Sequence, residues 1–243
     1  SVFCVILDPT QRFLASGGQD HIAIVWDLQN NATPVFTTHG HNDSVTCLAF
    51  SMDGYYLATG DMSGGVRVWS RPGSTDDTTW TLELAAEVGD LQWLTWWQPP
   101  DPKPRKTPIA VLAAGDINGA VTVWSIPHTN PSHVKYLPGS GIAATCGSFY
   151  GPSINTDRPK LAVLYTNASF KLWDVKSSEP LVTASLNSSR GENEVICMAC
   201  PQSRPSYDEA CKDRDYLVWG GDGVIQLAVV RQVDAGGEPS FVA

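Results

Sequence analysis

The sequence predicts an all-β protein made of repeated four-stranded units, and three observations support this prediction. Short apolar stretches that end in Trp recur, as in "LASGGQDHIAIVWD", "LATGDMSGGVRVWS" and "LAAGDINGAVTVWS". A polar turn with Gly interrupts each stretch, which is typical of two strands joined as a hairpin. The 243 residues include Gly 21 and Pro 17, which suits many short strands. Two weaker copies, "VLYTNASFKLWD" and "LVWGGDGVIQLA", bring the number of repeats to five.

The last strand of each hairpin sets the register of the repeats. Its closing residues recur at intervals of about 40 to 55 residues, which fits four-stranded propeller blades with insertions. We therefore expect third strands that end at Trp26, Trp69, Trp124, Trp173 and Ala228. These positions give one propeller domain over 1–243, with approximate repeats 1–38, 39–83, 84–137, 138–189 and 190–243.

The first strands of the repeats also align, as "SVFCVIL", "SVTCLAF", "DLQWLTW", "AATCGSF" and "EVICMAC". Strand alternation places one residue of each on a shared buried face. These residues are Cys4, Cys47, Trp93, Cys146 and Cys197. We expect the four cysteines to be buried free thiols, because they occupy the same strand position in separate blades.

Charge and hydropathy limit the classes of function. The formal net charge of -9 disfavours binding to a nucleic-acid backbone and favours a basic partner. No apolar run approaches the ~20 residues of a membrane-spanning helix, and the first residues lack the pattern of a signal peptide. We expect a cytoplasmic monomer with no direct nucleic-acid contact and no membrane insertion, and we leave nuclear presence open.

The second repeat, "GHNDSVTCLAFSMDGYYLATGDMSGGVRVW", resembles a WD repeat. The resemblance lies in the Gly-His pair at Gly40 and His41, in Thr59, and in the closing Trp69. In that family a His, a Ser or Thr, a turn Asp and the Trp are linked by hydrogen bonds within a blade. Ser63 stands at the turn Asp position, so we expect this network to be broken in the second repeat.

The first repeat keeps three members of the same pattern, Ser16, Asp20 and Trp26. The blocks "SVFCVILDP", "ATGDMSG", "GDLQWLTWW" and "ATCG" resemble the angio-associated migratory cell protein family, whose fungal relative is a dedicated chaperone for a large-subunit ribosomal protein. Members of that family resemble rings of seven or eight blades. Because five repeats are visible, we expect the chain to be a fragment of such a ring, and a five-bladed ring is the alternative.

Catalytic and metal chemistry find little support in the sequence. None of the five histidines accompanies a nucleophile elbow or a zinc-protease motif, so we expect His41 to be a structural hydrogen-bonding residue. Cys197, Cys200 and Cys211 lack the fourth ligand that zinc requires. We therefore expect no catalytic residue, no cofactor and no metal.

The repeat geometry predicts an acidic end of the blades. The turn between the second and third strands lies at the same end as the segment that leads into the first strand, because antiparallel strands alternate in direction. The residues that we expect there are Asp43, Asp61, Met62, Glu87, Asp90, Asp116, Glu192, Glu194 and Asp222. Arg12, Lys103, Arg105, Lys106 and Arg158 should lie at the opposite end.

An acidic end with an exposed thioether suits a basic peptide that carries apolar side chains. The resemblance implies a non-enzymatic scaffold of the ribosome-assembly chaperone type, which binds a basic segment of a large-subunit ribosomal protein. The alternative that it implies is a signalling scaffold in cell migration or angiogenesis.

Overall fold

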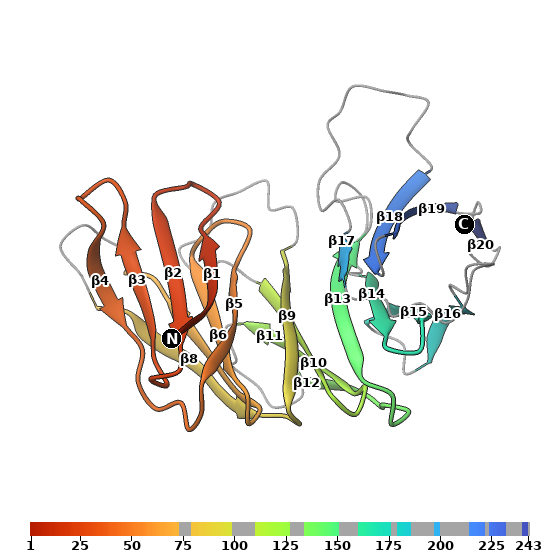
Figure 1. The fold of residues 1–243 in the computed structure, drawn as a ribbon, viewed down its shortest axis with the longest axis horizontal. Coiled ribbons are helices and arrows are strands. Elements are labelled where there is room, and N and C mark those ends of the chain that lie inside the picture. Colours follow the sequence, from red (N-terminus) through yellow and green to blue (C-terminus); the bar gives the residue numbers. More distant parts are fainter. Residues whose placement is uncertain are drawn as a thin grey trace. The chain divides into compact units, whose positions relative to one another are not determined.

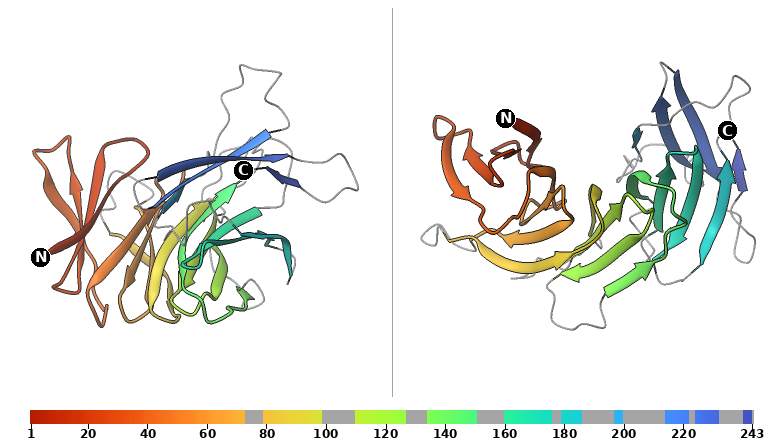
Figure 2. Two further views of the ribbon diagram at one scale, coloured as in Figure 1. Left: turned by 45° about the vertical axis from the view of Figure 1, so that its right-hand side comes forward. Right: turned by 60° about the horizontal axis from the view of Figure 1, so that its bottom comes forward.

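The structure is a computed structural model, and its described residues form β-strands without any helix (Figure 1). The described ranges are 1–72, 79–98, 110–126, 134–150, 160–175, 179–185, 197–199, 214–221, 224–231 and 240–242. Within them the strands make five four-stranded sheets, and the strands of each sheet follow one another in chain order. In Figure 2 the strand arrows within a sheet alternate in direction, as expected for hairpins.

The five sheets follow one another along the chain. The first sheet consists of β1 (Val2–Leu7), β2 (Phe13–Gly18), β3 (Ala23–Asp27) and β4 (Thr33–Thr37). The second consists of β5 (Val45–Phe50), β6 (Tyr56–Asp61), β7 (Gly65–Ser70) and β8 (Thr81–Glu87). The third consists of β9 (Leu91–Trp97), β10 (Ala110–Asp116), β11 (Val121–Ile126) and β12 (Val134–Leu137).

The two remaining sheets follow the same order. The fourth consists of β13 (Ala144–Tyr150), β14 (Lys160–Tyr165), β15 (Ser169–Asp174) and β16 (Pro180–Ser185). The fifth consists of β17 (Cys197–Ala199), β18 (Arg214–Gly221), β19 (Val224–Arg231) and β20 (Ser240–Val242). The five residues expected to close the third strands all lie in third strands, although these strands continue one to three residues further. The second sheet continues to Glu87, so the repeat boundary expected near residue 83 falls inside β8.

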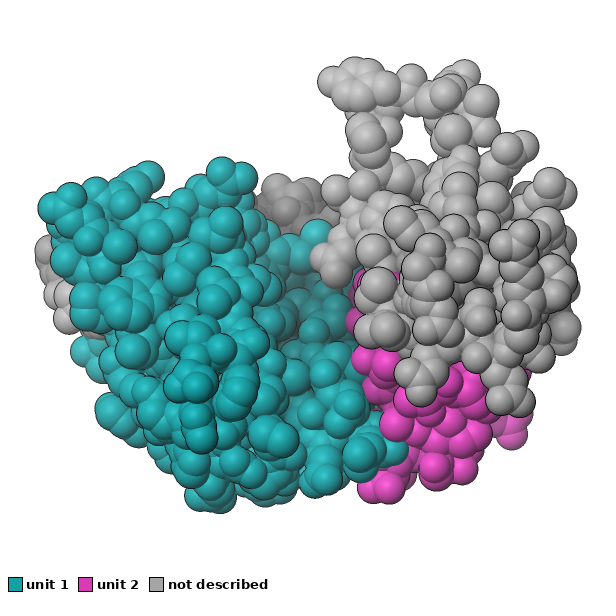
Figure 3. All heavy atoms as spheres, in the orientation of Figure 1, with its two compact units in different colours: residues 1–117, 121–135 teal, residues 118–120, 136–243 magenta. Residues whose placement is uncertain are grey.

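The chain divides into two compact units, residues 1–117 with 121–135 and residues 118–120 with 136–243 (Figure 3). In the first unit, aromatic side chains fill the space between neighbouring sheets. The Phe36 ring stacks on Trp80 at 5.0 Å between centroids and meets Trp69 edge-on at 5.2 Å. Between the second and third sheets, the Trp96 indole N–H donates to the carbonyl of Ala49 at 2.9 Å. In the second unit, Phe170, Leu164 and Leu172 form a buried cluster.

The cysteines of the first strands are free, as expected, but they are half-buried rather than fully buried. This holds for Cys4, Cys47 and Cys146, whereas the side chain of Cys197 lies outside the described residues. The Cys4 thiol is 3.5 Å from the carbonyl oxygen of Val45. First strands form the edge of their sheets, so no neighbouring strand of the same sheet covers one side of them. Burial nevertheless raises the pKa of the Cys47 thiol to about 11.

Candidate protein-binding surface

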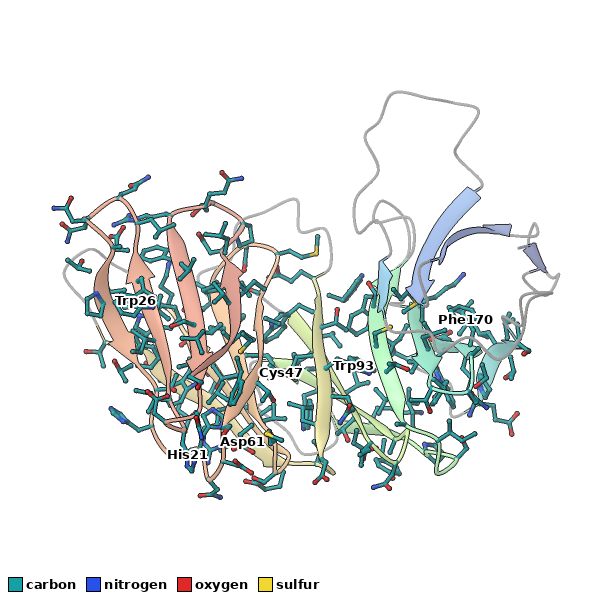
Figure 4. All side chains as sticks on the ribbon, viewed as in Figure 1. His21, Trp26, Cys47, Asp61, Trp93 and Phe170 are labelled. Carbon is teal, nitrogen blue, oxygen red and sulfur yellow. The ribbon has the colours of Figure 1, made fainter. Side chains whose placement is uncertain are left out.

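The turns between second and third strands lie beside the segments that lead into the first strands. The backbone N–H of Met62 donates to the carbonyl of Ser44 at 3.0 Å, and that of Ile117 donates to Asp90 at 2.9 Å. The equivalent bond in the first sheet runs from Gln19 to Ser1 at 2.9 Å. In Figure 4, Asp61 and His21 appear at the same end of the first unit. The structure thus brings together the two kinds of segment that the repeat geometry predicted to share an end.

Asp61 is the last residue of β6, directly before the turn in the second sheet, and is fully buried. Its Oδ1 accepts hydrogen bonds from the Gly65 N–H at 2.9 Å and the Ser63 hydroxyl at 2.8 Å. Its Oδ2 accepts from His41 at 2.8 Å and from the Asn42 N–H at 3.3 Å. The carboxylate therefore joins the turn to the segment that leads into β5, and it is not open to a partner.

A chain of hydrogen bonds continues from Asp61 through the sheet. The second ring nitrogen of His41, Nε2, lies 2.7 Å from the Thr59 hydroxyl, which accepts from the Trp69 indole N–H at 3.2 Å. The expectation that Ser63 breaks this network was wrong. Asp61 lies two residues before the expected position and supplies the carboxylate, while Ser63 donates to it. The structural role expected for His41 is confirmed.

The pKa values of both members of this buried pair are lowered, and these shifts define its charge. Burial lowers the pKa of His41 below its ordinary 6.5, and the nearby Arg67 guanidinium adds to this, so that together they outweigh Asp61. Burial raises the pKa of Asp61, but hydrogen bonds from His41, Gly65 and Ser63 outweigh it and hold the pKa below 3.8. At neutral pH a neutral His41 therefore donates from Nδ1 to the Asp61 carboxylate and accepts from Thr59 at Nε2.

Gly64 ties this turn to the third sheet. Its N–H donates to the carbonyl of Asp61 at 3.1 Å, and its own carbonyl accepts from Val88 at 2.9 Å. Its φ of +95° lies in the left-handed region that favours Gly, and a Cβ there would come within 2.3 Å of the Val88 carbonyl oxygen. The segment that leads into β9 is therefore fixed against the turn that carries Met62.

The exposure of the predicted site residues divides them into two groups. Met62 is 52% exposed, and Glu87 and Asp90 are also exposed. Asp43 is half-buried, and its Oδ1 accepts from the Ser44 N–H at 2.6 Å. Asp116 is only 8% exposed, so it joins Asp61 as a buried acid rather than a contact residue. Glu192, Glu194 and Asp222 lie outside the described residues.

Sequence reasoning missed Ile117, which is 45% exposed. It follows Asp116 as Met62 follows Asp61, and the blocks "GDMSG" and "GDING" show this equivalence. The predicted set contained the acids and Met62 but not this residue. The paired blocks were the signal that could have identified a second exposed apolar side chain at this end.

The cations near the candidate surface are largely committed to other contacts. The Arg67 side chain is 13% exposed, donates to the carbonyl of Gly40, and places Nη1 4.0 Å from Asp61 Oδ2. At the opposite end, Arg12 makes an ion pair with Asp27 at 2.8 Å. The other cations expected at that end, Lys103, Arg105, Lys106 and Arg158, lie outside the described residues.

Among the described residues, no group of three or more His, Cys, Asp or Glu side chains is placed to hold a metal ion. Cys200 and Cys211 of the possible cysteine cluster fall outside this part of the chain. The same described residues contain no helix that is long and apolar enough to cross a membrane.

Comparison with known proteins shows what these repeats are similar to. The family described as "WD domain, G-beta repeat" matches residues 1–27 and 32–70. The chain is 35% identical over 204 residues to the human angio-associated migratory cell protein, which is 83% of this chain and 41% of that protein. It is 28% identical over 160 residues to the ribosome assembly protein SQT1 of Saccharomyces cerevisiae, which is 65% of this chain and 34% of that protein. The chain thus spans less than half the length of these relatives.

Solved structures show the same fold. The crystal structure of Saccharomyces cerevisiae Sqt1 matches 100% of this chain and 62% of that one, with a TM-score of 0.73 and 20% identity. The β-propeller domain of Cps50 (Swd1) from Myceliophteria thermophila matches 97% of this chain and 67% of that one, with a TM-score of 0.68 and 16% identity. The sheets are therefore those of a β-propeller.

Proposed function

We propose that this WD-repeat propeller protein acts as a non-enzymatic scaffold of the ribosome-assembly chaperone type. The premise is its resemblance to the angio-associated migratory cell protein. Its partner is a basic segment of a large-subunit ribosomal protein. The segment binds at the end of the first unit where Met62, Glu87 and Asp90 are exposed. Of the longer list expected from the sequence, Asp61 and Asp116 are buried, Asp43 is half-buried, and Glu192, Glu194 and Asp222 lie outside the described residues.

The observation that carries this proposal is the exposure of Glu87 and Asp90 on a segment that hydrogen bonds fix on both sides. Val88 is bonded to the carbonyl of Gly64, and the carbonyl of Asp90 is bonded to Ile117. Acids held on a fixed backbone lose less conformational freedom on binding than acids on a loose loop. The net charge of -9 favours the approach of a basic partner from a distance.

Binding rather than catalysis is supported by the state of the buried His and Asp. Both ring nitrogens of His41 are occupied, one by Asp61 and one by Thr59. A general base needs a ring nitrogen that can reach a substrate proton, and His41 has none to offer. The network is suited to holding two loops in place.

The test is capture of partners by the purified chain from cell lysate, followed by quantification of large-subunit ribosomal proteins. Glu87→Gln with Asp90→Asn should reduce their recovery. Gln29→Lys with Asn30→Lys, beside β3 at the opposite end, changes the net charge by the same amount and should leave recovery unchanged. Equal losses with both variants would show that only net charge matters and would contradict the proposed surface.

A signalling scaffold in cell migration is the second candidate, favoured by the higher identity to the angio-associated migratory cell protein. The same capture experiment separates the two. Ribosomal proteins that depend on Glu87 and Asp90 support the chaperone function. Signalling proteins captured in their place, with no ribosomal protein lost in the acid variant, support the second candidate.

A further inference from the structure

Met62 and Ile117 occupy the same position in two successive sheets. Each follows a buried Asp, and each donates its backbone N–H to the segment that leads into the first strand of its own sheet. The backbone therefore holds both residues in the same way, while the side chains stay 52% and 45% exposed. A single exposed apolar residue is ordinary on a protein surface, but two at equivalent fixed positions form a pattern.

The acids of the candidate surface lie on the backbone segment between these two residues. That segment, 87–90, is bonded through Val88 to the Met62 turn at Gly64 and through Asp90 to Ile117. Following these bonds leads from Met62 to Glu87 and Asp90 and then to Ile117. All four residues belong to the first compact unit. The order of chemistry along this strip is apolar, acidic, apolar.

We infer that this strip, Met62, Glu87, Asp90 and Ile117, binds a peptide segment in which basic side chains lie between two apolar side chains. The inference rests on the proposed function. It adds that two apolar side chains, one on each side of the basic residues, distinguish the bound segment from other basic segments. The acids set orientation and the rate of association, while burial of the two apolar side chains contributes affinity that salt does not screen.

The two apolar positions differ in how closely they select a partner. The Met62 side chain is unbranched and flexible, so it adapts to partner side chains of different shape. Ile117 is β-branched and has few χ1 rotamers. We expect the partner side chain at Ile117 to be the more restricted of the two in size and shape.

Synthetic fluorescent peptides test this inference directly by anisotropy at several salt concentrations. The first series carries Lys and Arg residues between two leucines, with the number of basic residues varied. The second has serines in place of the leucines, and the third keeps the leucines but has Glu in place of Lys and Arg. The best leucine-basic peptide should bind about tenfold more tightly than its serine counterpart, and the acidic series should not bind.

Variants of the protein assign the effect to the strip. Met62→Ser with Ile117→Ser should remove the preference for leucine and leave the binding of the serine peptides unchanged. Met52→Ser with Leu28→Ser is the matched control, because these residues are 38% and 40% exposed in turns at the opposite end. This control should retain the preference.

Three results would overturn the inference, and they have different meanings. Equal affinity for leucine and serine peptides would show that Met62 and Ile117 contribute nothing to binding, while the acidic surface could still bind basic segments. Loss of the preference in the Met52 and Leu28 control would place the apolar contact elsewhere. Failure of every basic peptide to bind would overturn the proposed function as well, because the surface would then recognise no basic segment.

Discussion

The Nδ1 atom of His41 lies 2.8 Å from Oδ2 of Asp61, and both side chains are completely shielded from solvent. The pair joins the segment before β5 to the turn after β6, the two parts of the chain that carry Asp43 and Met62. A buried carboxylate that accepts several hydrogen bonds in this way controls the shape of the surface without being part of it.

Asp61→Ala should lower the free energy of unfolding by about 3 to 5 kcal/mol, because it leaves the buried donors of His41 and Gly65, and the partly buried N–H of Asn42, without their acceptor. Urea denaturation followed by tryptophan fluorescence measures this change. Asp90→Ala is the control, and as an exposed acid it should change stability by less than about 0.5 kcal/mol. Comparable losses from the two variants would contradict the central role of the Asp61 carboxylate.

The same pair predicts acid sensitivity. The folded pKa of His41 is below 6.5, so the unfolded chain binds the proton more readily and stability falls as the pH drops below about 6.5. The folded pKa of Asp61 is below 3.8, which adds a further loss once the pH falls under that value. For one group the slope is at most about 1.4 kcal/mol per pH unit. The midpoint of urea unfolding should therefore be lower at pH 5 than at pH 7.5.

Histidine variants show which residue causes the change in stability between pH 7.5 and pH 5. His41→Gln removes the titrating group and should flatten the dependence, whereas His21→Asn, at an exposed turn, should leave it as it is. A slope that survives in the His41 variant and disappears in the His21 variant would refute the assignment.

The repeat architecture could be predicted from the sequence because hairpins leave a local signal. Alternating apolar residues, turn formers and a closing Trp recur in each copy, and sheet pairing between adjacent strands follows from them. The position of the Asp61 carboxylate could not be predicted in the same way. The family pattern put the acid at residue 63, and only the folded turn shows that an acid two residues earlier reaches His41.

Exposure was the other property that the sequence left undetermined. The blocks "GDMSG" and "GDING" each contain an acid followed by an apolar residue, and the usual expectation is that the acid faces solvent. The structure reverses this for the acids, because Asp61 and Asp116 are buried, whereas Met62 is exposed as expected and Ile117 is exposed as well. For Asp61 the reason is that the carboxylate accepts hydrogen bonds from the backbone N–H of Gly65, at the start of β7, and of Asn42, in the segment before β5.

Cys47 should react slowly with iodoacetamide in the folded protein. With its pKa near 11 instead of the ordinary 9.0, the thiolate fraction at pH 8 is about a hundredfold smaller. Mass spectrometry of the Cys47 peptide over time measures the rate, and the urea-unfolded protein gives the reference. Met52→Cys introduces an exposed cysteine that should label at close to the unfolded rate. Equal rates for the two folded sites would show that Cys47 is not protected by burial.

Gly64→Ala should destabilise the second sheet more than Gly40→Ala does, although both glycines have left-handed φ values, +95° and +90°. Each substitution costs about 1 to 2 kcal/mol for the backbone conformation alone. A Cβ on Gly64 would also meet the carbonyl oxygens of Val88 and Gly89 at 2.3 and 2.6 Å, which cannot yield without moving the segment before β9. At Gly40 the nearest atom is Nε of the Arg67 side chain, at 3.4 Å.

Urea unfolding should therefore show the larger loss of stability for Gly64→Ala. This variant should also weaken peptide binding at Glu87 and Asp90, because the displaced backbone carries both acids. Equal stability losses, with peptide binding unchanged, would show that the contact between the Met62 turn and the third sheet does not fix the surface.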